Sequence, residues 1–240
     1  VVAVEALLRW QHPERGEVMP GEFIPVAERL GLIHRIDEWV MQAVCAQIRS
    51  WEKIGMPRIR VALNVSARWF GHPAFVESVS RTLQTHAVAP QRILLEITEG
   101  AMLKLGEDTE STMQALHSLG VAVAIDDFGT GYSSMAYLKL PAVAYLKIDR
   151  SFVTGLPDSV NDAAITEAML AMAKSLGLCP IAEGIETEAQ HEFLLRAGCI
   201  EGQGYLYSYP LPATAIERML CPKPVPANAR LKLVPPRRNT

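Results

Sequence analysis

The sequence has few cysteines and no excess of positive charge. Its four cysteines lie far apart in 240 residues, and no two of them have C-x-x-C spacing. This pattern argues against a disulfide framework, and we expect reduced thiols in a cytoplasmic domain. Lysine and arginine total 23 and aspartate and glutamate total 26, giving a net charge of −3. That balance argues against bulk electrostatic binding to a nucleic-acid polymer but allows a small anionic ligand held by a metal.

Long apolar runs and a signal peptide are also missing. No apolar run reaches the ~18 residues that a membrane span needs, and no signal peptide precedes the first strand-like segment. The chain begins at Val1 inside an apolar run without an initiator methionine. We therefore expect a piece of a longer protein, and a membrane anchor elsewhere in that protein stays open. The hydrophobic fraction of 49% and the charged fraction of 20% predict a folded domain.

Short apolar runs alternate with segments of helical periodicity. The predicted strands are Val2–Leu8, Ile59–Val65, Ile93–Ile97, Val121–Ile125, Val143–Ile148, Pro180–Glu183 and Ile200–Tyr207. The predicted helices are Ile36–Ile54, Pro73–Thr85, Asp108–Leu119, Asp162–Leu176 and Glu188–Ala197, with Gly55, Gly120, Gly177 and Gly198 ending four of them. Apolar strands that are each followed by a helix predict a parallel sheet covered on both faces. We favour a (β/α)8 barrel, whose eighth strand would lie before this chain, over an open doubly wound sheet.

The end of the chain differs in composition from the rest. Residues 221–240 contain five prolines and five basic residues but no acidic residue. This composition predicts an extended, mobile tail outside a folded domain of residues 1–220.

Polar residues stand at the ends of the predicted strands. They are Glu5, Asn64, Glu96, Glu99, Asp126, Asp127, Lys147, Asp149, Glu183 and Glu186. Burying an unpaired carboxylate is costly, so one such residue would suggest a salt bridge in the core. Six strands that each supply a polar residue at the same end predict a site instead, because the carboxyl ends of barrel strands converge on one mouth.

The chemistry of these residues favours a hard divalent cation. Converging carboxylates need a counter-charge, and oxygen ligands favour Mg²⁺ or Mn²⁺ over zinc. The six histidines have no metal-binding spacing. The adjacent Asp126 and Asp127 suit a bridge between two metals, whereas Lys147 suits either catalysis or a salt bridge to its acidic neighbours. The loop DDFGTGYSS, residues 126–134, has neither a Walker nor a Rossmann pattern, and we expect it to cover the metals.

Several motifs occur in a distinctive order. They are EALLRW from Glu5, NVS from Asn64, EITE from Glu96, DDFGTGYSS from Asp126, KID from Lys147, AEGIET ending at Thr187, and QGYLYSYPL from Gln203. Together they resemble the EAL-domain family of cyclic di-GMP phosphodiesterases, and the resemblance covers residues 1–220. It implies a (β/α)8 barrel whose first strand is antiparallel, and metal-dependent hydrolysis of cyclic di-GMP to linear 5′-pGpG.

The resemblance also implies a role for each site residue. Glu5, Asn64, Glu96 and Asp126 would bind one Mg²⁺ or Mn²⁺ ion, and Asp126 and Asp127 the second, with Glu186 nearby. Glu183 and Lys147 would order and activate the attacking water, without the motif deciding which is the base. Glu99 would anchor the DDFGTGYSS loop. Leu7, Arg9, Asp149 and Gln203 would serve the substrate, directly or through water.

Three further expectations follow from the same resemblance. The family's antiparallel strand carries a Y-Q-P segment that this chain lacks, so we expect an open seam in the barrel and reduced stability. Upstream GGDEF or sensory domains and a homodimer are common in the family.

Two other functions stay open: a silent cyclic di-GMP receptor, and an enolase-type lyase, which also places carboxylates and lysine at strand ends.

Overall fold

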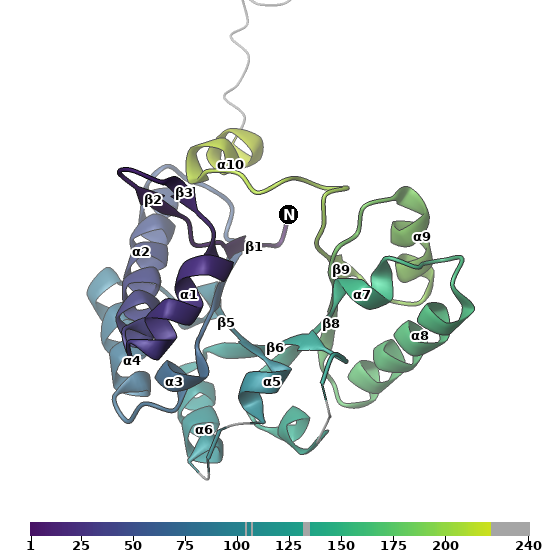
Figure 1. Cartoon of the computed structure of the whole chain (residues 1–240), viewed down its shortest axis with the longest axis horizontal. Coiled ribbons are helices and arrows are strands. Elements are labelled where there is room, and N and C mark those ends of the chain that lie inside the picture. Colours follow the sequence, from purple (N-terminus) through teal and green to yellow (C-terminus); the bar gives the residue numbers. More distant parts are fainter. Residues whose placement is uncertain (104, 107, 132–134, 222–240) are drawn as a thin grey trace, which may run out of the picture.

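Seven parallel strands form a curled sheet at the centre of the molecule (Figure 1). The computed structural model describes residues 1–103, 105–106, 108–131 and 135–221. The strands are β1 (Ala3–Ala6), β4 (Arg60–Asn64), β5 (Ile93–Thr98), β6 (Ala122–Phe128), β7 (Val143–Ile148), β8 (Cys179–Ala182) and β9 (Glu201–Gly202). Their spatial order follows their order in the chain. A doubly wound sheet would reverse that order at one point, so the barrel prediction is confirmed over the open alternative.

The five predicted helices form most of the outer layer (Figure 1). They are α2 (Ile33–Lys53), α4 (Phe75–His86), α6 (Thr109–Leu119), α8 (Val160–Ser175) and α9 (Glu188–Arg196). The four glycines predicted after helices have φ between 72° and 89°, the left-handed conformation that a residue with a Cβ rarely adopts.

The sequence did not predict several shorter elements. These are the hairpin of β2 (Trp10–His12) and β3 (Gly16–Val18), the helices α1 (Pro20–Arg29), α3 (Ala67–Phe70), α5 (Glu99–Met102), α7 (Arg150–Val153) and α10 (Ala213–Leu220), and the 3-10 turns η1 (Pro90–Arg92) and η2 (Met135–Lys139). The short helices α3, α5 and α7 each follow a strand directly and therefore lie around the carboxyl end of the sheet (Figure 1).

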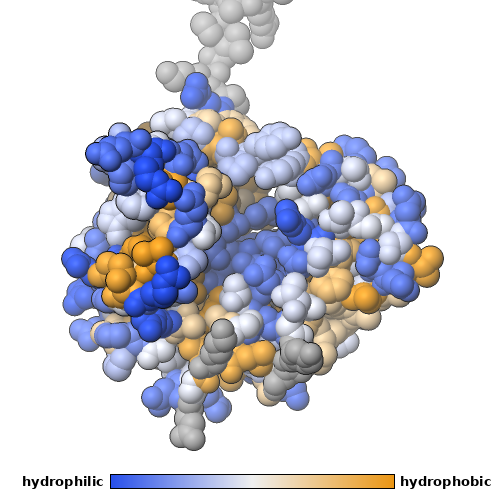
Figure 2. Space-filling view, in the orientation of Figure 1, coloured by the Kyte–Doolittle hydropathy of each residue, from blue (hydrophilic) through white to orange (hydrophobic). Residues whose placement is uncertain are grey.

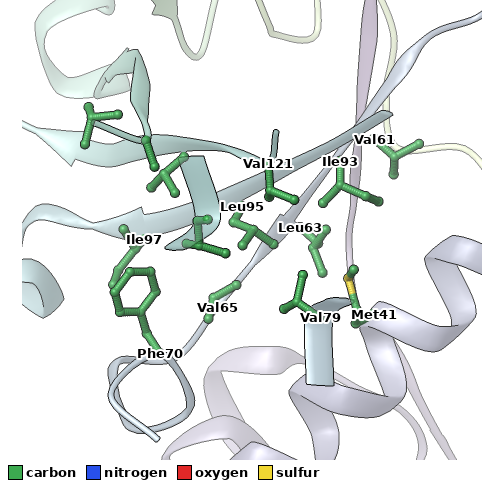
Figure 3. Close-up of a cluster of buried hydrophobic side chains, with 14 of the residues drawn as sticks. Met41, Val61, Leu63, Val65, Phe70, Val79, Ile93, Leu95, Ile97 and Val121 are labelled. Atoms are coloured by element: carbon green, nitrogen blue, oxygen red, sulfur yellow. The ribbon is translucent and has the colours of Figure 1, made fainter. Parts of the chain in front are cut away.

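Alternation along each strand separates the core from the barrel interior. On β4, Leu63 points outward and packs with Met41 of α2 and Val79 of α4 in the main apolar core (Figure 3). The neighbouring Ala62 belongs to a separate small cluster with Leu94 and Ala124 inside the barrel. Because the side-chain period of a strand is two, the residues two positions beyond these three also point into the barrel.

The sheet has an open seam between its edge strands, β1 and β9. Among the described residues, no ladder of backbone hydrogen bonds joins these two strands. Side chains span the seam instead: Gln203 Nε2 donates to Glu5 Oε2 over 2.8 Å, and Arg60 pairs with Glu201 over 2.5 Å. Strand β1 is parallel to β4, so the antiparallel strand that the resemblance implies is not one of the seven.

One predicted strand is shorter than expected. The prediction of Ile200–Tyr207 as a strand is wrong beyond Gly202, because the backbone of Gly204 lies directly against Ile185 and accepts a hydrogen bond from Tyr207 N. Tyr132–Ser134 of the DDFGTGYSS loop and residues 222–240 of the predicted tail lie outside the described residues. Within the described part of the chain, no helix has the length and apolar character that crossing a bilayer requires.

Candidate active site

Three carboxylates from neighbouring strands meet around Lys147 of β7. Its Nζ lies 2.9 Å from Glu96 Oε2 on β5, 3.0 Å from Asp126 Oδ1 on β6 and 2.8 Å from Glu183 Oε1, directly after β8. Lys147 and Glu96 are each 2% exposed. The ammonium therefore forms ion pairs with three carboxylates, which keeps the lysine protonated.

Burial and neighbouring charges shift the pKa values of this cluster. The pKa of Glu96 is raised to about 8, mainly by burial; Lys147 lowers it, and the charges of Glu5 and Asp126 raise it. Burial also raises the pKa of Glu183 to about 7, although Lys147 lowers it. Burial alone would lower the pKa of Lys147, but the surrounding carboxylates outweigh burial and raise it. The pKa values of the carboxyl groups rise mainly because they are buried, whereas the pKa of Lys147 rises because carboxylates surround it.

Asp127 brings a further carboxylate to the edge of the Lys147 cluster. Oxygens of Asp126, Asp127 and Glu183 lie within 4.8 Å of one another. Asp127 has φ 53°, and its backbone N donates to Asp126 Oδ1 over 3.0 Å. Burial, with the charges of Asp126 and Asp149, raises the pKa of Asp127. Clustered carboxylate oxygens with too little positive charge fit a hard divalent cation.

Glu5 on β1 lies beside the cluster and is held by two amides. Asn64 Nδ2 at the end of β4 donates to Glu5 Oε1 over 2.8 Å, and Gln203 Nε2 donates to Glu5 Oε2 over 2.8 Å. Because the carboxylate only accepts, the Asn64 amide must turn its nitrogen toward Glu5. The carbonyl oxygen of Asn64 then remains for another partner.

Glu99 is fully buried under the loop that follows β6. Its Oε2 accepts a hydrogen bond from Gly129 N over 3.0 Å, and its Oε1 accepts one from Tyr137 OH over 2.9 Å. A Cβ on Gly131 would lie 3.5 Å from the Glu99 carboxyl carbon, so the loop backbone packs directly on this side chain. Glu99 therefore holds both the start of the loop and the segment that follows the undescribed residues.

Other predicted site residues lie around the mouth. Glu186 is exposed, and its backbone N donates to Gln190 Oε1 over 2.8 Å. Asp149 caps α7 by accepting from Ser151 N over 3.0 Å. Leu7 is 43% exposed. These residues are thus not part of the buried cluster, and they line its surroundings.

Arg9 lies on the polar side of the β2–β3 hairpin. Its Nε is 3.5 Å from Glu17 Oε1, and a terminal nitrogen donates to the carbonyl of Leu8 over 2.8 Å. Figure 2 shows hydrophilic side chains gathered in the hollow enclosed by the strands. Arg9 itself lies in the segment that joins the carboxyl end of β1 to β2.

The sequence analysis missed Asp37 of α2, which supports the end of β4. Asp37 is 7% exposed and accepts hydrogen bonds from the backbone N and the hydroxyl of Ser66. A signal was present: Ile33, Asp37 and Met41 are spaced by four residues, so the carboxylate falls on the buried face of the helix.

Comparison with known proteins identifies the family. The family model described as the EAL domain matches residues 1–210. The chain belongs to the EAL domain family. This EAL domain is 45% identical over 213 residues to the Pseudomonas aeruginosa protein MucR, named a bifunctional diguanylate cyclase/cyclic di-GMP phosphodiesterase, covering 89% of this chain and 31% of that protein. It is 42% identical over 217 residues to cyclic di-GMP phosphodiesterase NbdA of the same organism, covering 90% of this chain and 28% of that protein.

Solved EAL-domain structures share the fold. The PaMucR phosphodiesterase in its c-di-GMP complex matches with a TM-score of 0.84 and 44% identity, over 90% of this chain and 87% of that one. The EAL domain of Mycobacterium smegmatis DcpA matches with a TM-score of 0.80 and 37% identity, over 94% and 92% of the two chains. The chain spans about a third of the length of the curated relatives, 31% of MucR and 28% of NbdA.

Proposed function

We propose that this EAL domain hydrolyses one phosphodiester bond of cyclic di-GMP to give linear 5′-pGpG, in the presence of Mg²⁺ or Mn²⁺. The observation that carries the proposal is the buried Lys147 ammonium, ringed at 2.8–3.0 Å by Glu96, Asp126 and Glu183 at the carboxyl ends of adjacent strands. The names of MucR and NbdA and the c-di-GMP complex of PaMucR supply the substrate class.

The residues present fit two divalent ions. Glu5, Asn64, Glu96 and Asp126 would hold one ion, and Asp126 and Asp127 the other, with Glu186 nearby. All of these ligands offer oxygen, and the carboxylates outnumber the ammonium of Lys147, so bound cations would relieve their repulsion. When bound, such ions supply charge neutralisation at the phosphate and a more acidic water.

The geometry divides the roles of Glu183 and Lys147. Lys147 lies within ion-pair distance of three carboxylates, so it would act as a fixed ammonium that orients Glu183 and balances charge as the phosphate is attacked. Glu183, whose side chain is 16% exposed, is the carboxylate of the three that is most open to solvent. We assign Glu183 as the acceptor of the water proton.

The substrate would bind across the mouth. Cyclic di-GMP carries two phosphates, and a guanidinium is suited to a planar, two-point contact with one of them. Arg9 would make that contact beside Leu7, and Asp149 and Gln203 would serve the substrate directly or through water. Glu99 would hold the DDFGTGYSS loop over the site.

The test is chromatographic detection of 5′-pGpG from cyclic di-GMP with Mg²⁺ or Mn²⁺, against a chelator. We expect Glu183→Gln to abolish product while Glu192→Gln, an exposed carboxylate of α9, leaves the rate unchanged. Product formation by Glu183→Gln at the wild-type rate would refute the role of Glu183. A wild-type domain that binds the nucleotide without cleaving it would be a receptor, and cleavage of phosphodiester model compounds alone would refute the substrate.

We also propose a setting for the domain. It would act in the cytoplasm as the catalytic unit of a longer signalling protein with GGDEF or sensory domains, as the name of its relative MucR suggests. Residues 1–220 would form the folded unit and residues 221–240 a tail. We expect a homodimer, which light scattering with and without nucleotide would test, and a mass of one chain under both conditions would refute it.

A further inference from the structure

The end of strand β4 is held from outside the barrel by a side chain of helix α2. Asp37 is a buried carboxylate of that helix, 7% exposed. Its Oδ2 accepts a hydrogen bond from Ser66 N over 3.3 Å and a second one from the Ser66 hydroxyl. Ser66 follows Asn64 by two residues. Because the Asp37 carboxylate is buried and accepts a hydrogen bond from the backbone N of Ser66, it fixes the position of the chain directly after β4.

The Ser66 hydroxyl has no freedom to turn elsewhere. Its Oγ accepts a hydrogen bond from Trp69 N over 3.2 Å as the N-cap of α3. Trp69 and Phe70 are buried at 2% and 1% exposure, so α3 is anchored in the core. A hydroxyl has one hydrogen to donate, and Asp37 receives it. The carboxylate, the hydroxyl and the short helix therefore form one connected unit.

Asn64 is the last residue of β4 and directly precedes the segment that Asp37 and Ser66 hold. Val65 N donates to the carbonyl of Glu96 over 2.8 Å, and Asn64 lies opposite Glu96 in the register of β4 and β5. The two residues after Asn64 are thus fixed in different directions, Val65 to β5 and Ser66 to α2. This leaves the Asn64 amide aimed at Glu5 Oε1, 2.8 Å away, with its carbonyl oxygen available.

We propose that Asp37 is a positioning residue for the metal site, acting through Ser66 to set the end of β4 so that Asn64 presents its carbonyl oxygen to a divalent cation. The inference rests on the proposed function, because that function supplies the cation. Asp37 itself touches neither metal nor substrate. Residues that orient metal ligands typically change metal affinity by about 10–100-fold when they are removed.

The test measures Mn²⁺ affinity by electron paramagnetic resonance, without nucleotide, on variants whose folding is checked by circular dichroism. We expect Asp37→Ala to weaken Mn²⁺ binding by about 10–100-fold. Asp37→Asn keeps an acceptor oxygen for Ser66 and should stay within about threefold of the wild type. The matched control is Ser78→Ala, which removes another part-buried hydrogen bond to α2, from Ser78 Oγ of α4 to Glu38 Oε1, with neither residue in β4. We expect it to leave the affinity unchanged.

A double-mutant cycle separates positioning from general destabilisation. If Asp37 acts through Asn64, Asp37→Ala should cost little further affinity once Asn64→Ala is present. An equal loss in both backgrounds would overturn the proposal, as would wild-type affinity in Asp37→Ala. If Asp37→Ala does not fold, Ser66→Ala takes its place with the same expectations. A wild-type domain without Mn²⁺ affinity would overturn the proposed metal dependence and this inference with it, whereas loss of hydrolysis alone would leave this inference standing.

Discussion

Replacing Lys147 with methionine tests the central feature of the site. Methionine keeps an unbranched side chain of similar length but removes the ammonium that contacts Glu96, Asp126 and Glu183. Lys147 is 2% exposed, so solvent cannot take over its role. Removing one partner of a buried ion pair costs about 3–5 kcal/mol. For a domain of this size each kcal/mol shifts the melting temperature by roughly 2–4 °C, so we expect a loss of about 6–20 °C.

The loss of stability caused by Lys147→Met should grow as the pH rises. Burial already raises the pKa of Glu183 to about 7 and that of Glu96 to about 8 with the lysine present. A carboxyl group whose pKa is higher in the folded state stabilises the fold below its unfolded pKa, and this contribution is lost as pH rises through the folded pKa. Lys147→Met raises these folded pKa values further. The difference in melting temperature between Lys147→Met and the wild type should therefore increase above about pH 7. Adding Glu96→Gln to Lys147→Met should reduce this difference.

The assay is thermal unfolding in chelator across this pH range, beside Lys174→Met as a control at an exposed lysine of α8. Equal melting temperatures for Lys147→Met and the wild type at every pH would refute a stabilising role of the Lys147 ion pairs. The predicted effect of pH is refuted if Glu96→Gln adds to the loss at high pH, because the excess of carboxylates would then not be what destabilises the variant.

Three further predictions concern the cation site, Asp37 and the ion pair of Arg9 with Glu17. Saturating Mn²⁺ should raise the melting temperature, since ligand at 100 times its Kd stabilises by about 2.7 kcal/mol; no rise would refute a cation site in the folded domain. Burial raises the pKa of Asp37 from 3.8 to about 6, so its contribution to stability, about 3 kcal/mol at 1.36 kcal/mol per pKa unit, is lost as pH rises from about 4 to 6. Denaturant unfolding should show a flatter pH profile for Asp37→Asn, and an unchanged profile would contradict this. Glu17→Gln should tighten nucleotide binding by at most about fivefold at low salt, because an exposed pair contributes up to about 1 kcal/mol and here competes for Arg9; calorimetry that finds weaker binding would show that Glu17 positions Arg9 instead.

Local pattern was sufficient for the long elements of the barrel. The apolar strands and the glycines that end the helices are signals that a few neighbouring residues carry, so they can be recognised without knowledge of the fold. Helix α2 begins at Ile33 rather than at the predicted Ile36, because its N-cap, Leu32, has no capping side chain to signal the start. The β2–β3 hairpin has three-residue strands, which are too short for a period of two to be recognised.

The sequence could indicate which acids belong to the site, but not how they are connected. Glu96, Asp126 and Glu183 each end an apolar strand, and this is a local signal. The contact of all three with one ammonium depends on the stagger between neighbouring strands, such as Lys147 opposite Ile181. No spacing in the sequence encodes that stagger. The hydrogen bond from Tyr137 to Glu99 joins residues 38 positions apart, and nothing in the sequence signals it.

The two halves of the site are held by different means, and this separates their expected responses. The Lys147 cluster lies on or directly after β5 to β8, whose backbones pair with one another as neighbouring strands of the sheet. Glu5 lies on an edge strand, and across the seam it is held by the amide of Gln203, 198 positions away in the sequence. A side-chain hydrogen bond contributes about 1 kcal/mol, far less than a ladder. Loss of the hydrogen bond from Gln203 should therefore displace Glu5, which is a ligand only under the proposed function, and weaken cation binding while the ion pairs of Lys147 stay intact.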